Sequence, residues 1–206
     1  MNIPYEIHIT VEPKNKSVEL FKQDCLTCGV KPILLDLHTK QNNLIMKDLM
    51  TSSVVHANSV DSIINEATKL SELLKTLGYS VLRLKIEAPP WHPLAPTKNN
   101  KIVLNNNQNY FESHLNIMCD NSNKELLTII AKNHKAHRST NAFKVYENNF
   151  TMMITLRDKE NYLEIFQENL NKLKTEIMLN GFLLEKEIVE FCIFDSNENH
   201  DSVWTK

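Results

Sequence analysis

The chain has 206 residues, of which 42% are hydrophobic and 23% are charged, and its 23 basic and 25 acidic residues give a net charge of −2. Such a composition is that of an ordinary globular protein with a sizeable core. The small net charge argues against duplex nucleic acid as a partner. We also expect no membrane partner, because no stretch approaches eighteen uninterrupted apolar residues and the N-terminus lacks a signal-peptide layout. Four cysteines are too few for a secreted disulfide framework, which favours a reducing, cytoplasmic location.

The first half of the chain alternates between strand and helix patterns. Period-two alternation predicts strands, whereas apolar residues three and four apart predict helices. In chain order the patterns predict a strand, a helix, two strands, a helix and a strand, at residues 7–12, 15–29, 31–38, 47–55, 60–78 and 79–87. Gly29 and Gly78 stand where the two helices should end, because glycine tolerates the left-handed conformation found there.

From residue 111 the same order of patterns recurs. YEIHITVE at 5–12 matches FESHLNIM at 111–118, and the later elements follow at 123–133, 141–147, 150–158, 160–181 and 182–194. A linker rich in Pro, Asn and Lys separates the copies at 89–110, and a polar tail follows at 196–206. We therefore predict an α+β, bilobal protein made of two ferredoxin-like (βαββαβ) halves, 1–88 and 111–195, that arose by duplication.

One face of each predicted sheet carries polar and charged side chains. Side chains alternate between faces along a strand, and the first strand of a ferredoxin-like sheet neighbours the third and the fourth. The predicted polar faces consist of Glu6, His8, Thr10, Thr51, Ser53, Arg83, Lys85 and Glu87 in the first half, and of Glu112, His114, Asn116, Thr155, Arg157, Lys186 and Glu190 in the second. If these faces pack together, His8 and His114 share a cleft. The ordinary alternative is a sheet face exposed to water.

His8-x-Thr10 and His114-x-Asn116 resemble the paired His-x-Thr/Ser motifs of two-histidine phosphoesterases, although Asn116 departs from that pattern. The resemblance implies a metal-independent hydrolase that needs no cofactor and acts on small cyclic phosphates, nucleotides or RNA-end phosphodiesters. His8 and His114 would act as acid and base, since imidazole titrates near neutral pH. The implied substrate-binding residues are Thr10, Asn116, Lys85, Thr155 and Arg157. On an open sheet face, Lys85→Ala is expected to leave the fold unchanged.

Two other functions fit the same residues. One is a metal-dependent enzyme, because a set of four residues in corresponding positions of the two halves resembles the metal site of vicinal-oxygen-chelate enzymes. The set is His8, Glu87, His114 and Glu190. Nitrogen and oxygen ligands of this kind bind a divalent metal. The other is a non-catalytic module that binds a small molecule or a protein, so the sequence leaves open whether the protein is an enzyme.

Overall fold

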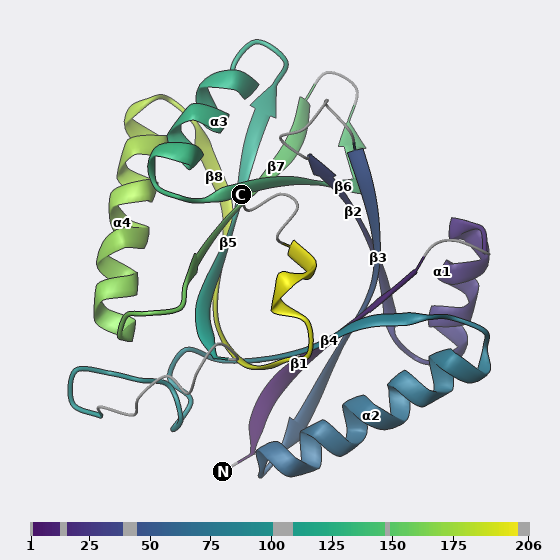
Figure 1. Cartoon of the computed structure of the whole chain (residues 1–206). Coiled ribbons are helices and arrows are strands. Elements are labelled where there is room, and N and C mark those ends of the chain that lie inside the picture. The colour runs from purple at the N-terminus through teal and green to yellow at the C-terminus, as the bar shows by residue number, and fades with distance from the viewer. Residues whose placement is uncertain (1, 13–15, 39–44, 101–108, 147–148, 202–206) are drawn as a thin grey trace.

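The computed structural model describes residues 2–12, 16–38, 45–100, 109–146 and 149–201. This part of the chain is a mixed α+β structure with eight strands, four α-helices and one short 3₁₀ helix (Figure 1). The first half contains β1 (Ile3–Val11), α1 (Val18–Thr27), β2 (Lys31–His38), β3 (Ile45–Ala57), α2 (Val60–Thr76) and β4 (Val81–Ala88). The second half contains β5 (Tyr110–Asp120), α3 (Lys124–Asn133), β6 (His137–Tyr146), β7 (Asn149–Asp158), α4 (Leu163–Leu179), β8 (Leu183–Asp195) and the 3₁₀ helix η1 (Glu198–Asp201). No described helix is long and apolar enough to cross a membrane.

Local sequence accounts for most of the helix boundaries. Ser17 and Ser59 precede α1 and α2, and each side-chain oxygen accepts a hydrogen bond from a backbone N–H in the first turn. Gly29, Gly78 and Gly181 follow α1, α2 and α4 with φ angles of 71°, 87° and 80°. The predicted ends of these helices at left-handed glycines are therefore confirmed.

The eight strands form one closed barrel in the order β1-β3-β2-β6-β7-β5-β8-β4. Within each half the first strand lies between the third and the fourth, as predicted. The halves join edge to edge through the pairs β2–β6 and β4–β8, which corrects the prediction of two lobes that flank a cleft. Each half alone would leave backbone N–H and C=O groups unpaired on its edge strands, and closure of the barrel pairs them.

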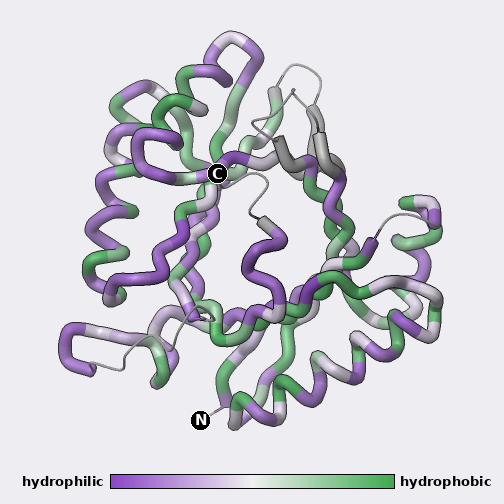
Figure 2. The backbone as a smooth tube through the Cα atoms, viewed as in Figure 1, coloured by the Kyte–Doolittle hydropathy of each residue, from purple (hydrophilic) through white to green (hydrophobic). Residues whose placement is uncertain are grey.

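The four helices lie outside the barrel, α1 and α2 against the first half and α3 and α4 against the second (Figure 1). Apolar strand side chains face these helices and form the core, in which Ile9, Phe21 and Ile63 are completely buried. Hydrophobic and hydrophilic residues alternate along the strands (Figure 2). Because successive side chains point to opposite faces of a strand, the polar ones point into the barrel.

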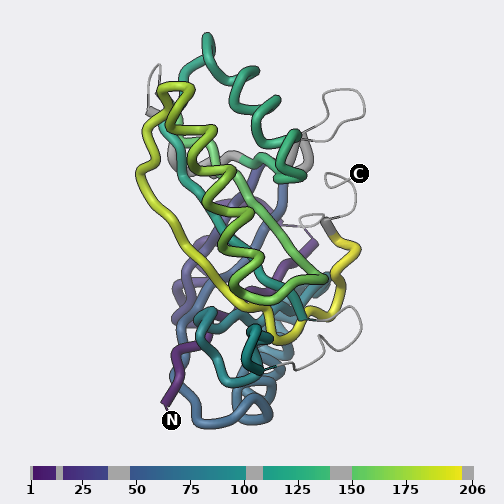
Figure 3. Tube along the Cα trace, turned by 90° about the vertical axis from the view of Figure 1, so that its left-hand side faces the viewer, coloured from purple at the N-terminus to yellow at the C-terminus, as the bar shows by residue number. Residues whose placement is uncertain are grey.

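The segment after β8 crosses one end of the barrel (Figures 1 and 3). Here Glu198 of η1 forms an ion pair with Lys159 at 2.5 Å, and Nε2 of His200 lies 3.0 Å from Oδ1 of Asp48 in β3. Polar residues of the chain itself therefore cover this end. The predicted tail extends to residue 206, and its last five residues lie outside the described part.

Candidate functional site

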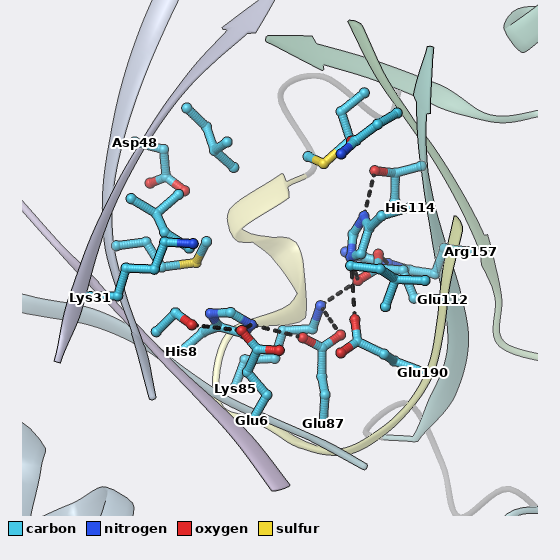
Figure 4. Close-up of a pocket in the computed structure, with 18 of the residues that line it drawn as sticks. Glu6, His8, Lys31, Asp48, Lys85, Glu87, Glu112, His114, Arg157 and Glu190 are labelled. Atoms are coloured by element: carbon cyan, nitrogen blue, oxygen red, sulfur yellow. Dashed lines mark hydrogen bonds and ion pairs between the residues drawn. The ribbon is translucent and has the colours of Figure 1, made fainter. Parts of the chain in front are cut away.

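The barrel encloses a cavity of about 260 Å³ (Figure 4). Side chains from β1 to β5 and from β7 and β8 line it. They include His8 and His114, so the structure brings the two predicted histidines to one cavity. This volume is close to the lower end of the range of small-molecule sites.

Most residues of the two predicted polar faces line this cavity. Those that do are Glu6, His8, Arg83, Lys85, Glu87, Glu112, His114, Asn116, Thr155, Arg157, Lys186 and Glu190. Thr10 is 1% exposed and is not part of the lining, so it lies out of reach of a molecule in the cavity. The β1–β3 register places Ser52 opposite His8, so the inward residue of β3 is Ser52. This corrects the predicted face by one residue, because Thr51 and Ser53 point the other way.

His8 meets hydrogen-bond acceptors at both ring nitrogens. Its Nδ1 donates to the carbonyl oxygen of Thr51 at 3.2 Å, and its Nε2 lies 3.1 Å from Oε2 of Glu87. A neutral imidazole carries a single N–H, so both contacts are hydrogen bonds only in the doubly protonated ring. The geometry therefore presents His8 as a proton donor beside the cavity.

His114 holds the corresponding position in the second half but has a different environment. Its Nδ1 forms a hydrogen bond with the hydroxyl group of Thr155 at 3.0 Å. Its Nε2 is 3.6 Å from Glu112 and 3.7 Å from Glu190, which is beyond ordinary hydrogen-bond length. Burial lowers the pKa of His114 below its usual value of 6.5, although the Glu112 carboxylate opposes this effect. His114 is therefore a neutral ring at pH 7, and its Nε2 can accept a proton.

Lys85 is the cation at the centre of the site. Its side chain is buried, and its Nζ lies 2.6 Å from Oε1 of Glu87 and forms a second ion pair with Glu112. Burial by itself lowers the pKa of Lys85, but the Glu112 and Glu87 carboxylates outweigh it and raise that pKa above its usual value. The ammonium group therefore stays charged and links β4 to β5 over the intervening strand β8.

Glu112 meets a second cation that comes from β7. Nε of Arg157 donates to Oε1 of Glu112 at 2.7 Å, and the guanidinium carbon lies 4.5 Å from the ring centroid of Tyr110. Burial by itself raises the pKa of Glu112, but Arg157 and Lys85 outweigh it and hold that pKa well below its usual value. Two cations thus fix this buried carboxylate in place and keep it ionised.

Glu87 and Glu190 hold matching places on the last strands of the two halves, yet they differ in protonation. Burial by itself raises the pKa of Glu87, but the adjacent Lys85 ammonium outweighs it and the pKa falls to about 2. Burial and the Glu87 carboxylate raise the pKa of Glu190 to about 9. In the second half, the place of Lys85 is taken by Ile188, which brings no charge. One ionised and one neutral carboxyl group side by side are typical of acid–base sites.

Replacing Glu190 with glutamine is expected to remove a loss of stability at alkaline pH. Folded Glu190 keeps its proton up to about pH 9, whereas an unfolded glutamate loses it near pH 4.5. Between these values the folded state binds more protons, so its stability falls by up to about 1.4 kcal/mol for each unit that pH rises. Urea unfolding should therefore show wild type losing roughly 2–3 kcal/mol relative to Glu190→Gln between pH 6.5 and 8.5. Parallel pH curves would contradict the raised pKa, and Glu187→Gln on the outer face of β8 is the control.

Three of the cavity residues could surround a metal ion. Glu87, Glu112 and His114 present ligand atoms within 4.8 Å of one another, and only Glu87 and His114 belong to the metal set predicted from the sequence. Lys85 forms ion pairs with both carboxylates of this group and so takes the place of a metal cation. To bind here, a divalent ion would have to displace the ammonium group of Lys85 from its two buried carboxylate partners, which costs free energy.

Sequence reasoning missed two features of the site. The first is a buried cluster in which Arg83 donates to both carboxylate oxygens of Asp195, and Tyr110 donates to Asp195 at 2.7 Å. Asp195 ends β8, and only the β4–β8 pairing brings it beside Arg83, so no sequence pattern marks it. The second is a set of hydrophobic side chains that we call the apolar wall. It consists of Ile33, Leu35, Met50, Met153 and Ile188.

Comparisons with known proteins give no family for this chain. No family model and no curated protein matches it. Among solved structures, the small subunit of acetolactate synthase from Thermotoga maritima is 8% identical with a TM-score of 0.28, over 92% of this chain and 94% of that one. A putative monooxygenase from Fusobacterium nucleatum subsp. nucleatum ATCC 25586 is 12% identical with a TM-score of 0.31, over 93% of this chain and 91% of that one. Similarity this low says nothing of activity, so function must be argued from the cavity.

Proposed function

We propose that this chain is a metal-independent enzyme that transfers protons on a small organic molecule bound inside the barrel. One observation supports this most strongly, namely that the cavity holds two histidines whose ring nitrogens have different surroundings. His8 has acceptors at both nitrogens, whereas the buried ring of His114 is neutral. One ring can therefore give a proton while the other takes one, as general acid–base catalysis requires.

In the proposed reaction His114 takes a proton from the carbon next to a carbonyl group, and His8 gives a proton to the carbonyl oxygen. Thr155 holds Nδ1 of His114, so the ring presents Nε2 to the substrate. Protonated Glu190 donates a hydrogen bond to a substrate oxygen on which negative charge develops. A carbonyl compound that loses a proton from the neighbouring carbon needs a base and a donor of this kind, so such compounds are the proposed substrates.

Phosphodiester hydrolysis, which the two-histidine resemblance implies, is the second candidate. In its favour, both histidines are held through Nδ1 and present Nε2 to one cavity. Against it, Glu6 and Glu87 lie within 3.5 Å and 3.1 Å of Nε2 of His8, and their carboxylates would repel a phosphate there. Thr10, the second residue of the first motif, does not line the cavity. Proton transfer on a neutral group is therefore the better supported reaction.

We also infer that the halves are two ferredoxin-like units that arose by duplication. Each half has the same element order and the same strand order. In each half the histidine stands opposite a hydroxyl side chain of the third strand, Ser52 for His8 and Thr155 for His114. A cytoplasmic location is part of the proposal, because all four cysteines are free thiols.

Deuterium exchange tests the proposed function. A panel of small ketones and keto acids is incubated with the protein in D₂O and followed by NMR. Wild type is expected to accelerate exchange at the carbon next to the carbonyl group, and EDTA is expected to leave the rate unchanged.

Nucleoside 2′,3′-cyclic phosphates are assayed in parallel. Their hydrolysis without any exchange would favour the phosphodiester reaction, and activity that EDTA removes and Zn²⁺ or Mn²⁺ restores would favour the metal-dependent one. Binding without turnover would indicate a non-catalytic module.

A further inference from the structure

The acid–base groups of the cavity lie together on one side of the barrel. Four strands that are consecutive in the closed ring, β5, β8, β4 and β1, carry them. Figure 4 shows these groups along the lower and right-hand sides of the cavity. We call this side the acid–base wall, and its members are Glu6, His8, Lys85, Glu87, Glu112, His114 and Glu190.

Most of the apolar wall lies across the cavity from these groups. In a closed ring of eight strands the strand four places away is diametrically opposite, so β5 faces β3, β8 faces β2 and β1 faces β7. Of the apolar wall, Met50 lies on β3, Ile33 and Leu35 lie on β2, and Met153 lies on β7. Only Ile188, on β8, lies among the acid–base groups. A molecule that contacts the histidines therefore has hydrocarbon side chains on its other side.

The charged groups at the centre of the cavity neutralise one another. Lys85 forms ion pairs with Glu87 and Glu112, and Arg157 also pairs with Glu112. These four side chains carry two positive and two negative charges. Glu190 adds no charge at pH 7, because burial and the Glu87 carboxylate raise its pKa to about 9. The centre of the site therefore has no excess charge for a ligand to balance.

The other charged groups that line the cavity are either paired within the chain or solvated. The pairs are His8 with Glu6 at 3.5 Å, Arg83 with Asp195 at 2.5 Å, and His200 with Asp48 at 3.0 Å. Lys31 and Lys186 are exposed, so water solvates their ammonium groups. A ligand that brings its own charge into the cavity loses hydration without gaining an unpaired partner, which costs free energy. Apolar surface of a ligand, by contrast, is bound favourably against the apolar wall.

We propose that the substrate of this cavity is a small neutral carbonyl compound with a hydrocarbon body, and that charged analogues such as keto acids bind more weakly. The carbonyl group lies against the acid–base wall, where His114 and His8 exchange protons with it. The hydrocarbon body packs against Met50, Met153 and the rest of the apolar wall. This inference rests on the proposed function, because it takes the cavity to be the place where the substrate of proton transfer binds.

NMR titration at pH 7 with three probes of nearly equal size and shape tests the inference. The probes are the neutral acetophenone, the anion benzoate and the cation benzamidine. The signals followed are the methionine methyl groups, because Met50 and Met153 line the cavity and report binding there. Wild type is expected to bind acetophenone at least about tenfold more tightly than either charged probe, since only the charged probes lose the hydration of an ion.

A variant in the apolar wall assigns the preference to a place. Met153→Gln keeps nearly the same side-chain length but puts an amide group against the hydrocarbon body of the probe. Acetophenone is expected to bind this variant about tenfold more weakly, because the probe covers the amide without offering it a hydrogen bond. Met178→Gln makes the same chemical change at an exposed position at the end of α4, so it is the matched control and should leave binding unchanged within about twofold.

Several outcomes would overturn the inference. They are a charged probe that binds wild type as tightly as acetophenone, an acetophenone affinity that Met153→Gln leaves unchanged, and absence of binding by all three probes. The titration involves no turnover, so the two proposals fail separately. Preferred binding of acetophenone together with absence of deuterium exchange contradicts the proposed enzyme alone. Exchange on keto acids but not on neutral ketones contradicts this inference alone.

Discussion

Replacing His114 with glutamine is expected to lower kcat/KM for deuterium exchange by roughly 10²–10⁴-fold, the range that one general base contributes. Glutamine can keep a hydrogen bond to Thr155, but it cannot take up a proton at neutral pH. Wild-type activity should also fall as pH drops below about 6.5, because His114 then gains a proton and stops acting as a base. Since burial lowers this pKa, the half-maximal pH should lie below 6.5, and the glutamine variant should show no such fall.

Two further variants make this result specific. His8→Asn is expected to reduce the rate to a similar extent, and the double variant should lose little more than either single one, because acid and base act in one reaction. His134→Gln is the control, since His134 lies outside the barrel and pairs with Glu176 at 2.7 Å. A folded His114→Gln variant that keeps wild-type activity would exclude His114 as the base.

Replacing Lys85 with methionine is expected to lower the free energy of unfolding by about 3–5 kcal/mol at pH 7, the usual effect of removing one partner of a buried ion pair. The substitution leaves the carboxylates of Glu87 and Glu112 with one cation fewer. This corrects the expectation that a Lys85 substitution would not alter the fold, because that expectation assumed an open sheet face. Urea unfolding measures the effect. Lys69→Met, at an exposed lysine paired with Glu66, should change stability by less than about 1 kcal/mol.

The same variant is expected to bind a divalent ion. Without the ammonium group of Lys85, the ligand atoms of Glu87, Glu112 and His114, within 4.8 Å of one another, become available to a cation. Zn²⁺ at 100 times its dissociation constant would then add about 2.7 kcal/mol to the free energy of unfolding. Wild type should gain no such stability, and Lys85→Met/His114→Gln should lose most of it. Equal stabilisation of wild type by Zn²⁺ would show that Lys85 does not exclude a metal.

The order of elements could be predicted because each one carries a local cue. A glycine marked the end of three helices, and alternation of polar and apolar residues marked the strands. The boundary between α3 and β6 was placed less well, since the predicted strand began at 141 and β6 begins at His137. After α3 the left-handed residue is Lys135, with φ of 56°, so the glycine that marks the other helix ends is missing. No residue in the sequence therefore marked the start of β6 at His137.

Sequence patterns predicted which side chains of one strand share a face, but not which strands of the two halves pair. The inward residues of β1, β4 and β5 follow from clear alternation of polar and apolar side chains, whereas β8 is less clearly polar on its inward face. In β3 the run from Thr51 to Val55 lacks that alternation, so its inward side was assigned one residue away from Ser52. Closure into a barrel depends on which edge strands pair across the halves. Backbone pairing at an edge leaves little trace in side-chain pattern, so the enclosure of Lys85 and the pairing of Arg83 with Asp195 could not be foreseen.

A cavity made from two similar halves of one chain can be asymmetric. In a homodimer of a single half, every residue would occur twice, so an ammonium group like that of Lys85 would stand on both sides and Ile188 would have no place. Glutamates equivalent to Glu87 and Glu190 would then share one protonation state. Covalent connection of the halves removes this constraint, because each half can change without the other. The chain can thus assign proton release to one half and proton uptake to the other, at positions that a symmetric assembly would have to keep identical.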